Sequence, residues 1–428
     1  MPRTIVPCTV ALVLAVCSAA AAAPPSGFTA PATLGTNLQV SGVVAAADAA
    51  GGQDAAVAFA DRSGGVWAAR VRPDGSLGAP LPAVSGGQVD VRDVGVVVTD
   101  RGEVVVVWAA LLDRRGHSAV RYAVAEPGRS FSGVHTLATV GSNTSATPRV
   151  AALRRGTVAV VYRDLRPGAR SGVLRYARRA AHGSFGPRRS LRHDGVFPQI
   201  QATPGGGALL AWAQGSLTRR TLMVASAQRG APLPGRASSV AGRVRSIGLF
   251  AGADGTAWVA WTNRRTGALA TGAARRIRAS NIAAVGPVRQ LGTVTYGSPH
   301  LALGADGQVF AAWNQRGPGA QPNVQLAAAA GSGASLGATS SFDAGGFSQT
   351  SPIPALLGSA PLVLFTRQVA DATGAVPPEL AAADPSTGEA TVLGGAGTIG
   401  APAVAHAGAS LVVAWAARGG GVAVSVHP

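Results

Sequence analysis

Two aspartates three positions apart, Asp90 and Asp93, come nearest in this chain to a catalytic pair. Hydrolysis of a glycosidic bond needs two carboxyl groups roughly 5 to 10 Å apart, one of them acting as an acid. Arg92 lies between them in the sequence, and its guanidinium group could hold an anionic substituent of a substrate. Aspartate also caps tight turns, and we favour that structural role for both residues.

Other titratable side chains either precede a short apolar segment in the same way or directly follow the large aromatic residue at the end of one. We expect them to meet Asp90 and Asp93 at one face of the fold and to form a ligand-binding surface without catalytic residues. The predicted binding residues are Asp90, Arg92, Asp93, Arg163, Asp164, Arg166, His193, Tyr296 and His300.

The sequence predicts neither a metal site nor a cofactor. Its seven histidines are scattered, and none forms a His-x-x-x-His pattern. The two cysteines, Cys8 and Cys17, both lie near the N-terminus and leave no thiol for the remainder of the chain. The glycine-rich stretches suit β-turns rather than a phosphate-binding loop that precedes a helix.

The elements that would position these residues follow from a regular repeat. Eight short apolar segments each end in one large aromatic residue, and successive aromatics are 49 to 54 residues apart. A period near fifty with strand-like patterning is typical of a β-propeller, with one four-stranded blade per repeat. The anchor aromatics, which we expect in the core between blades, are Phe59, Trp108, Tyr162, Trp212, Trp261, Trp313, Phe365 and Trp415.

The sixth repeat illustrates the predicted blade. Residues 299–303 would form the inner strand, 304–307 a tight turn, 309–313 a second strand that is apolar on both faces, and 324–327 a third strand. The outer fourth strand would begin with a serine and a large apolar residue: Ser335-Leu336 here, and Ser76-Leu77, Ser130-Phe131 and Ser184-Phe185 elsewhere. At the first residue of the inner strand a proline costs no ladder hydrogen bond, which fits Pro148, Pro198, Pro299, Pro352 and Pro402.

The two ends of the repeat array complement each other. The last repeat stops after its third strand, and residues 28–34 resemble an outer strand with nothing before it. We therefore predict that residues 28–34 complete the blade begun near Ala401, which removes a free sheet edge. The expected fold is all-β: an eight-bladed β-propeller of four-stranded antiparallel blades, closed by this N-terminal strand and forming one domain over residues 24–428.

Charge divides between two sets of loops. The loops after the anchors hold thirteen arginines against four aspartates, whereas the turns between first and second strands hold three arginines against six acidic residues. Because these connections emerge at opposite ends of an up-and-down blade, one face should carry a positive ring that attracts anions. All 37 basic residues are arginine. This indicates a bias of genome composition, so exposed arginine without a role is the favoured alternative, and the net charge of +18 gives no reason to expect a nucleic-acid partner.

Residues 1–23 have the pattern of a secretory signal peptide. Arg3 supplies the positive start, residues 5–16 the apolar core, and the alanines of 19–23 a cleavage region. We expect a secreted protein without a transmembrane segment. The alternative is a lipoprotein attached through Cys17, although Val16 is larger than the residue usual before such a cysteine.

The repeat resembles those of secreted bacterial β-propellers, as Pro148 to Tyr162, Pro198 to Trp212 and Pro299 to Trp313 show. It is distantly similar to sialidase-type propellers, a resemblance that implies fold more than activity. The sialidase Asp-box, Ser-x-Asp-x-Gly-x-x-Trp, is not matched: the corresponding turn reads Arg-Pro-Asp-Gly-Ser over residues 72–76. Sialidases also use a tyrosine nucleophile with a glutamate partner. Here only Tyr296 falls on the expected face, and no glutamate falls in a loop there.

The predicted function is that of an exported, non-catalytic, monomeric binding propeller. Its partner would be an extracellular glycan, an anionic envelope polymer or another protein, held on the arginine-bearing face. The alternative is a sialidase-like or other glycoside hydrolase with its site at the mouth of the central axis. A purely structural surface protein is a third possibility.

Overall fold

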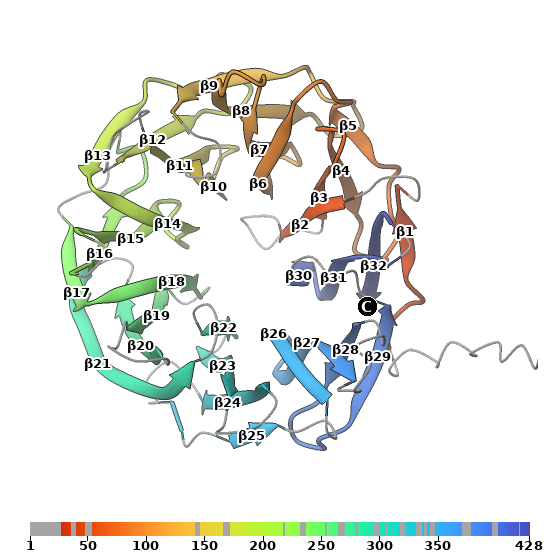
Figure 1. The fold of residues 1–428 in the computed structure, drawn as a ribbon, viewed down its shortest axis with the longest axis vertical. Helices are drawn as coiled ribbons and strands as arrows, with labels where there is room; N and C mark the ends of the chain where they lie inside the picture. Colours follow the sequence, from red (N-terminus) through yellow and green to blue (C-terminus); the bar gives the residue numbers. More distant parts are fainter. Residues whose placement is uncertain are drawn as a thin grey trace, which may run out of the picture.

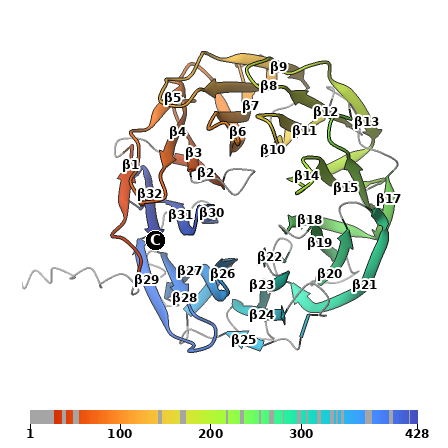
Figure 2. The same cartoon turned by 180° about the vertical axis from the view of Figure 1, so that it is seen from behind.

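The computed structural model describes residues 27–35, 40–47, 54–141, 146–165, 172–216, 219–231, 237–252, 255–263, 270–278, 281–294, 299–304, 307–316, 322–330, 336–337, 340–342, 347–369, 378–395, 401–418 and 420–428. Eight four-stranded antiparallel sheets stand around a central axis as the blades of a propeller (Figure 1; Figure 2 shows the same ring from behind). The predicted fold class is confirmed.

Seven blades are each built from one continuous stretch of chain. Their strands run in sequence from the axis outward. The first four of these blades comprise β2 (Val40–Ala47), β3 (Ala55–Asp61), β4 (Val66–Val71) and β5 (Leu81–Val84); β6 (Asp90–Val98), β7 (Val104–Leu111), β8 (Ser118–Ala125) and β9 (His135–Val140); β10 (Arg149–Ala152), β11 (Val158–Asp164), β12 (Val173–Arg179) and β13 (Arg189–His193); and β14 (Gly195–Ala202), β15 (Ala208–Gln214), β16 (Thr221–Ala227) and β17 (Ser238–Gly242).

The remaining blades complete the circle. They comprise β18 (Val244–Ala251), β19 (Thr256–Asn263), β20 (Ala270–Arg278) and β21 (Asn281–Val294); β22 (His300–Leu303), β23 (Gln308–Arg316), β24 (Pro322–Ala330) and β25 (Ser340–Phe342); β26 (Phe347–Leu357), β27 (Ala360–Val369), β28 (Glu379–Ala383) and β29 (Ala390–Gly395); and β30 (Ala403–Ala407), β31 (Ser410–Ala416) and β32 (Val422–His427) with β1 (Ala32–Leu34).

The core lies between blades, and the second strand of each blade supplies much of it. In β3, Ala58 belongs to an apolar cluster shared with β6 and β7, while Phe59 belongs to one shared with β31 and β32. Such a strand must be apolar on both faces, because successive side chains point to opposite sides. All eight anchor aromatics are at most 3% exposed, which confirms their place in the core.

The ring closes as predicted. Strand β1 pairs with β32, so the outermost strand of the last blade comes from the N-terminal part of the chain. The backbone N–H of Thr29 donates to the Val426 carbonyl at 2.8 Å, and the Val426 N–H donates to Thr29 Oγ1 at 3.0 Å. Phe28 is buried and meets His427 edge to face, with ring centroids 5.1 Å apart.

The inner strands differ from expectation at two prolines. Pro148, Pro299 and Pro402 directly precede β10, β22 and β30. Pro198 and Pro352 instead lie inside β14 and β26, where the ladder register shifts between Val196 and Gln199 and between Thr350 and Ile353. A β-bulge leaves a residue unpaired and so tolerates a proline as well as a strand start does.

A positive φ recurs at or just before the inner strand of three successive blades. Asp93, Thr147 and Phe197 each stand fifteen residues ahead of their anchor, and each has a positive φ, at 49°, 37° and 54°. Positive φ is uncommon for residues other than glycine. Its recurrence at one position of three successive repeats indicates that the blade geometry imposes it.

The outer strands begin later than predicted. Leu77, Phe131 and Phe185 each form one isolated bridge to the third strand. The ladder proper begins four residues further on, at Leu81, His135 and Arg189. The serine and apolar pair therefore anchors the turn between the third and fourth strands rather than starting the outer strand.

A buried ion pair joins two neighbouring blades. Glu103, just before β7, receives two hydrogen bonds from the Arg179 guanidinium at the end of β12, at 3.0 and 3.1 Å. The two side chains are 1% and 3% exposed. The Nδ1 atom of the exposed His182 lies 3.4 Å from Glu103 Oε1 and 3.8 Å from Glu126 Oε1.

Candidate functional site

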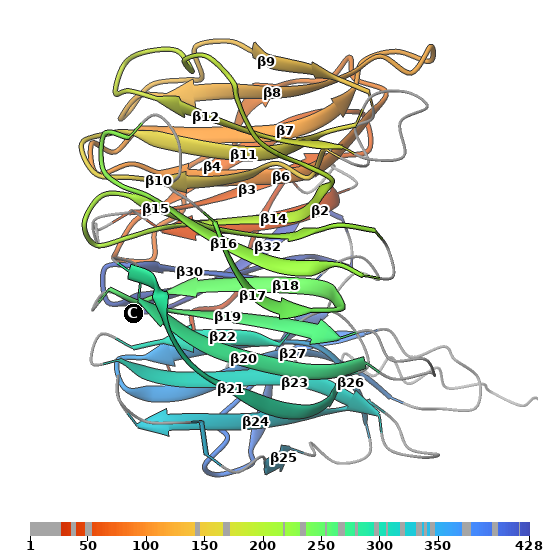
Figure 3. The ribbon, with the colours of Figure 1, turned by 90° about the vertical axis from the view of Figure 1, so that its left-hand side faces the viewer.

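The connections of the blades gather on two faces of the ring, which Figure 3 shows edge-on. We call the face with the second-to-third-strand connections and the links between blades the loop face. The opposite face, with the tight turns between first and second and between third and fourth strands, is the turn face. The anchors lie near the loop-face end of the second strands, so the described arginines that follow them, such as Arg163 and Arg220, belong to this face.

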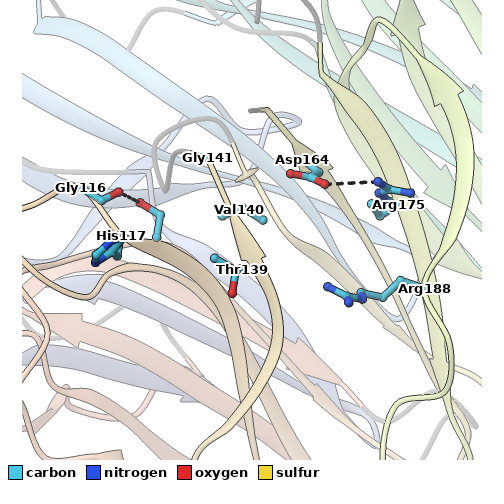
Figure 4. Close-up of a pocket in the computed structure, with 9 residues that line it drawn as sticks. Gly116, His117, Thr139, Val140, Gly141, Asp164, Arg175 and Arg188 are labelled. Atoms are coloured by element: carbon cyan, nitrogen blue, oxygen red, sulfur yellow. Dashed lines mark hydrogen bonds and ion pairs between the residues drawn. The ribbon is translucent and has the colours of Figure 1, made fainter. Parts of the chain in front are cut away.

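A cleft of about 540 Å³ opens between the blade β6–β9 and the blade β10–β13 near the loop face. The connection before β8, the end of β9, the end of β11, strand β12 and the segment before β13 each contribute to its walls (Figure 4). Its lining residues are Gly116, His117, Ser118, Thr139, Val140, Gly141, Asp164, Arg175 and Arg188.

The carboxylate in this cleft is already paired. Arg175 places Nη2 3.4 Å from Asp164 Oδ2 and also donates to the Ser190 hydroxyl. His117 is paired through Nδ1 with Asp113, whose pKa is held below its ordinary value by that hydrogen bond. The acidic groups Asp164 and Asp113 therefore already have side-chain partners of their own.

Arg188 supplies a further positive charge to the cleft. Its side chain is exposed, and Figure 4 shows its guanidinium group directed toward the side of Thr139. It also lies against the hydroxyl of Tyr162, although burial dominates there and raises the pKa of Tyr162 to about 12. The cleft thus presents a guanidinium group together with the hydroxyl of the exposed Thr139.

On the other side of β11 lies a second cluster, which we call the arginine pair, formed by Arg163 and Arg220. Burial lowers the pKa of Arg163, and the nearby Arg220 lowers it further, while Asp194 acts in the opposite direction. Within the part of the chain that the structure describes, Arg163 Nε is buried and has no hydrogen-bond acceptor. Arg163 can occupy this position because residue 172 is a glycine. A Cβ atom at residue 172 would lie only 2.5 Å from Arg163 Nε.

An aromatic ring stands beside the arginine pair. The Arg220 guanidinium lies 5.0 Å from the centroid of the Phe197 ring, within the range of a cation–π contact. Phe197 is 38% exposed, unusual for so large an apolar side chain in this structure. Two positive charges next to an accessible ring can bind an anion that also has an apolar face.

The structure brings some of the predicted residues together. Asp90 opens β6 and receives a 2.8 Å hydrogen bond from Arg92 Nε. Asp93 lies in the bulge of β6, 3.4 Å from Arg149 Nη1 of the next blade. Each carboxylate therefore has its own arginine, and Asp93 has a positive φ of 49° inside the strand.

The remaining predicted residues are spread around the ring. Arg163 and Asp164 end β11; Arg163 belongs to the arginine pair, and Asp164 lines the cleft. His193 ends β13, paired in the ladder with Val173. His300 opens β22 in a distant blade, and burial lowers its pKa to about 4, so it is neutral at neutral pH. Arg166 and Tyr296 lie outside the described residues.

Sequence reasoning missed Arg175, Arg188 and Phe197. Arg175 is directly opposite the anchor Tyr162 in the ladder, as Arg121 is opposite Trp108. The sequence signal for Arg175 is an arginine at the third-strand position that faces an anchor. The sequence-based prediction considered charged residues in loops only.

Clustered metal ligands and long apolar helices are both absent from the described part of the chain. No three His, Cys, Asp or Glu side chains gather there as a metal ion would require. Nor does that part contain a helix long and apolar enough to span a bilayer.

A scan against models of known protein families finds no match, and a search of curated proteins also finds none. Several solved structures are similar at low identity. Puromycin hydrolase is 15% identical with a TM-score of 0.49, over 94% of this chain and 61% of that chain. A polysaccharide lyase, PL25 ulvan lyase, is 13% identical with a TM-score of 0.47, over 83% and 95%. The BP39L lectin from Burkholderia pseudomallei is 13% identical with a TM-score of 0.47, over 83% and 98%. These likenesses extend no further than the fold.

Proposed function

We propose that this protein is an exported, non-catalytic binding propeller that holds an anionic extracellular glycan on its loop face. The observation that carries the proposal is the placement of cations on both sides of one blade. Arg188 faces the cleft on one side of the blade β10–β13, and the arginine pair with Phe197 lies on the other.

The chemistry of these groups suits an acidic sugar. Guanidinium groups bind carboxylate and sulfate through two parallel hydrogen bonds. An aromatic ring offers an apolar surface on which the carbon face of a sugar can pack. A chain molecule could contact both places at once and gain affinity from the linkage, which favours a polymer over a single small ion.

Glycoside hydrolysis is the weaker proposal. A hydrolase needs one carboxyl group free to donate a proton and a second to act as base or nucleophile. Asp90, Asp93 and Asp164 each lie within 3.4 Å of an arginine nitrogen instead. Export is supported by the signal-peptide pattern of residues 1–23.

The test is a titration of the protein with polygalacturonate, with neutral dextran and with poly-glutamate, at two salt concentrations. We expect polygalacturonate to bind, dextran not to bind, and affinity to fall as salt rises. Poly-glutamate should bind more weakly, because it lacks a sugar ring to pack on Phe197. Equal binding of dextran would contradict the proposal, and release of new reducing ends would support the hydrolase instead.

Single substitutions locate the surface. Loss of one charge-assisted contact should weaken polygalacturonate binding about tenfold in Arg188→Gln and in Arg163→Gln. Arg229→Gln is the matched control, since this exposed arginine lies in the turn after β16 on the opposite face. Equal affinities for all three variants would show that the loop face is not the binding surface.

A further inference from the structure

A second concave site lies on the turn face, between the blade β2–β5 and the blade β6–β9. This turn-face groove has a volume of about 200 Å³. Small residues of β4 and β8, among them Ala68, Ala69 and Ala125, leave the space open, and Val104 and Phe131 add apolar surface. Gly78 and Gly128 also line the groove without side chains to fill it.

Three arginines line the same groove. Arg70 is half-buried, lies 3.7 Å from Asp54 and donates to the Gly102 carbonyl, so it is fixed in place. Arg72 and Arg129 are exposed and make weaker contacts, with Ser76 Oγ at 3.3 Å and with Glu126 at 3.6 Å. The described lining contains no Asp or Glu.

We propose that the turn-face groove binds a small amphiphilic carboxylate, such as a short-chain fatty acid, with its chain on the apolar floor and its carboxylate between Arg72 and Arg129. Small-molecule sites are typically apolar with a few orienting polar groups, and this one has both. Its volume equals roughly seven water molecules at about 30 Å³ each, which suits a ligand of about eight non-hydrogen atoms such as hexanoate.

The proposal is independent of glycan binding, since the two sites occupy opposite faces. The experiment is calorimetric titration of the full chain with butanoate, pentanoate, hexanoate and hexan-1-ol. Hexanoate should bind with a Kd on the order of 1 mM, given its size. Each methylene should tighten binding about fourfold while it fits the groove. Hexan-1-ol, without the charge, should bind about tenfold more weakly.

Two variants test the position. Ala79→Leu adds bulk at an exposed lining residue and should abolish hexanoate binding without touching the core. The double variant Arg72→Gln/Arg129→Gln should bind hexanoate no better than hexan-1-ol, while Arg229→Gln, in the equivalent turn of another blade, should bind like the parent protein. Hexanoate affinity unchanged by Ala79→Leu would overturn the site. Equal affinity of the parent protein for hexanoate and hexan-1-ol would overturn the carboxylate preference.

Discussion

Glu103 shows how a single buried charge can tie two blades together. Its carboxylate is almost wholly removed from solvent and is matched by both terminal nitrogens of Arg179. Burial alone would raise the pKa of Glu103, but the hydrogen bonds and charge of Arg179 outweigh it and hold the pKa below 4.5. A carboxylate with a depressed pKa in the folded state stabilises the fold above its ordinary pKa of 4.5 and loses that contribution as pH falls through the folded value.

Replacing Glu103 by glutamine should therefore destabilise the protein strongly. The change leaves the Arg179 charge buried without a counter-charge, which typically costs about 3–5 kcal/mol. Thermal unfolding at pH 7 should show a clear drop, and the difference from the parent protein should shrink below pH 4.5. The double variant Glu103→Gln/Arg179→Met should recover part of the loss. A single variant as stable as the parent would mean that the pair contributes nothing.

Which titratable residues lie near one another could be predicted only in part from the sequence. Asp90, Asp93 and their arginines lie near one another because they share a strand or adjoining inner strands. The cleft is different: it depends on how the outer strands of two blades face each other. Sequence spacing contains no information on that distance, so Arg188 could not be connected with His117 in advance.

At the scale of the strand, the recurrent positive φ at the start of the inner strands is the feature with the clearest energetic consequence. Thr147 is β-branched yet has a φ of 37°, a strained conformation for such a side chain. Its hydroxyl is buried and lacks a hydrogen-bond partner among the described residues. The strained backbone and the buried hydroxyl without a partner both belong to Thr147, so one substitution removes both costs.

Thr147→Gly should accordingly leave the protein as stable as before or more stable by about 1 kcal/mol, contrary to the usual effect of glycine in a strand. For a chain of this size the melting temperature should rise by roughly 1–2 °C. The matched control is Val150→Gly in the adjoining strand β10, which should destabilise. A lower melting temperature for Thr147→Gly would show that the backbone at residue 147 is not strained.

The strands themselves could be predicted because burial fixes their patterning. Second strands such as β7, with Val104 to Ala110 buried on both faces, must read as uninterrupted apolar runs. Bulges and outer strands leave fainter signals, since a bulge changes register without changing composition. The position of Pro198 inside β14 could therefore not be distinguished from a strand start.

At the scale of the whole molecule, the even spacing of the anchors predicted the number of blades. Each blade contributes one large aromatic side chain, at the same position of its second strand, to the core between neighbouring blades. Closure could be predicted because the last repeat has only three strands and a single strand lies at the other end of the array. Pairing the two completes the blade and removes a free sheet edge.

Phe28 is the residue through which closure can be measured. It belongs to the apolar cluster that includes Leu393, Leu411 and Trp415, and this cluster extends over the seventh blade and the last. Phe28→Ala should cost about 3–5 kcal/mol and lower the melting temperature clearly. Thr33→Ala, an exposed position of β1, should change stability by less than about 0.5 kcal/mol. Indistinguishable melting curves for these two variants would refute the structural importance of the N-terminal strand.

The contact between Thr29 and Val426 has a practical corollary for protein engineering. Because residues 29 and 426 already meet in one sheet, a short peptide could connect residues 27 and 428 covalently in a variant without residues 1–26. The backbone could then be opened between β5 and β6, so that β6 comes first and β5 last. Such a circular permutant would retain every strand pairing while offering fresh attachment points at another place on the circumference.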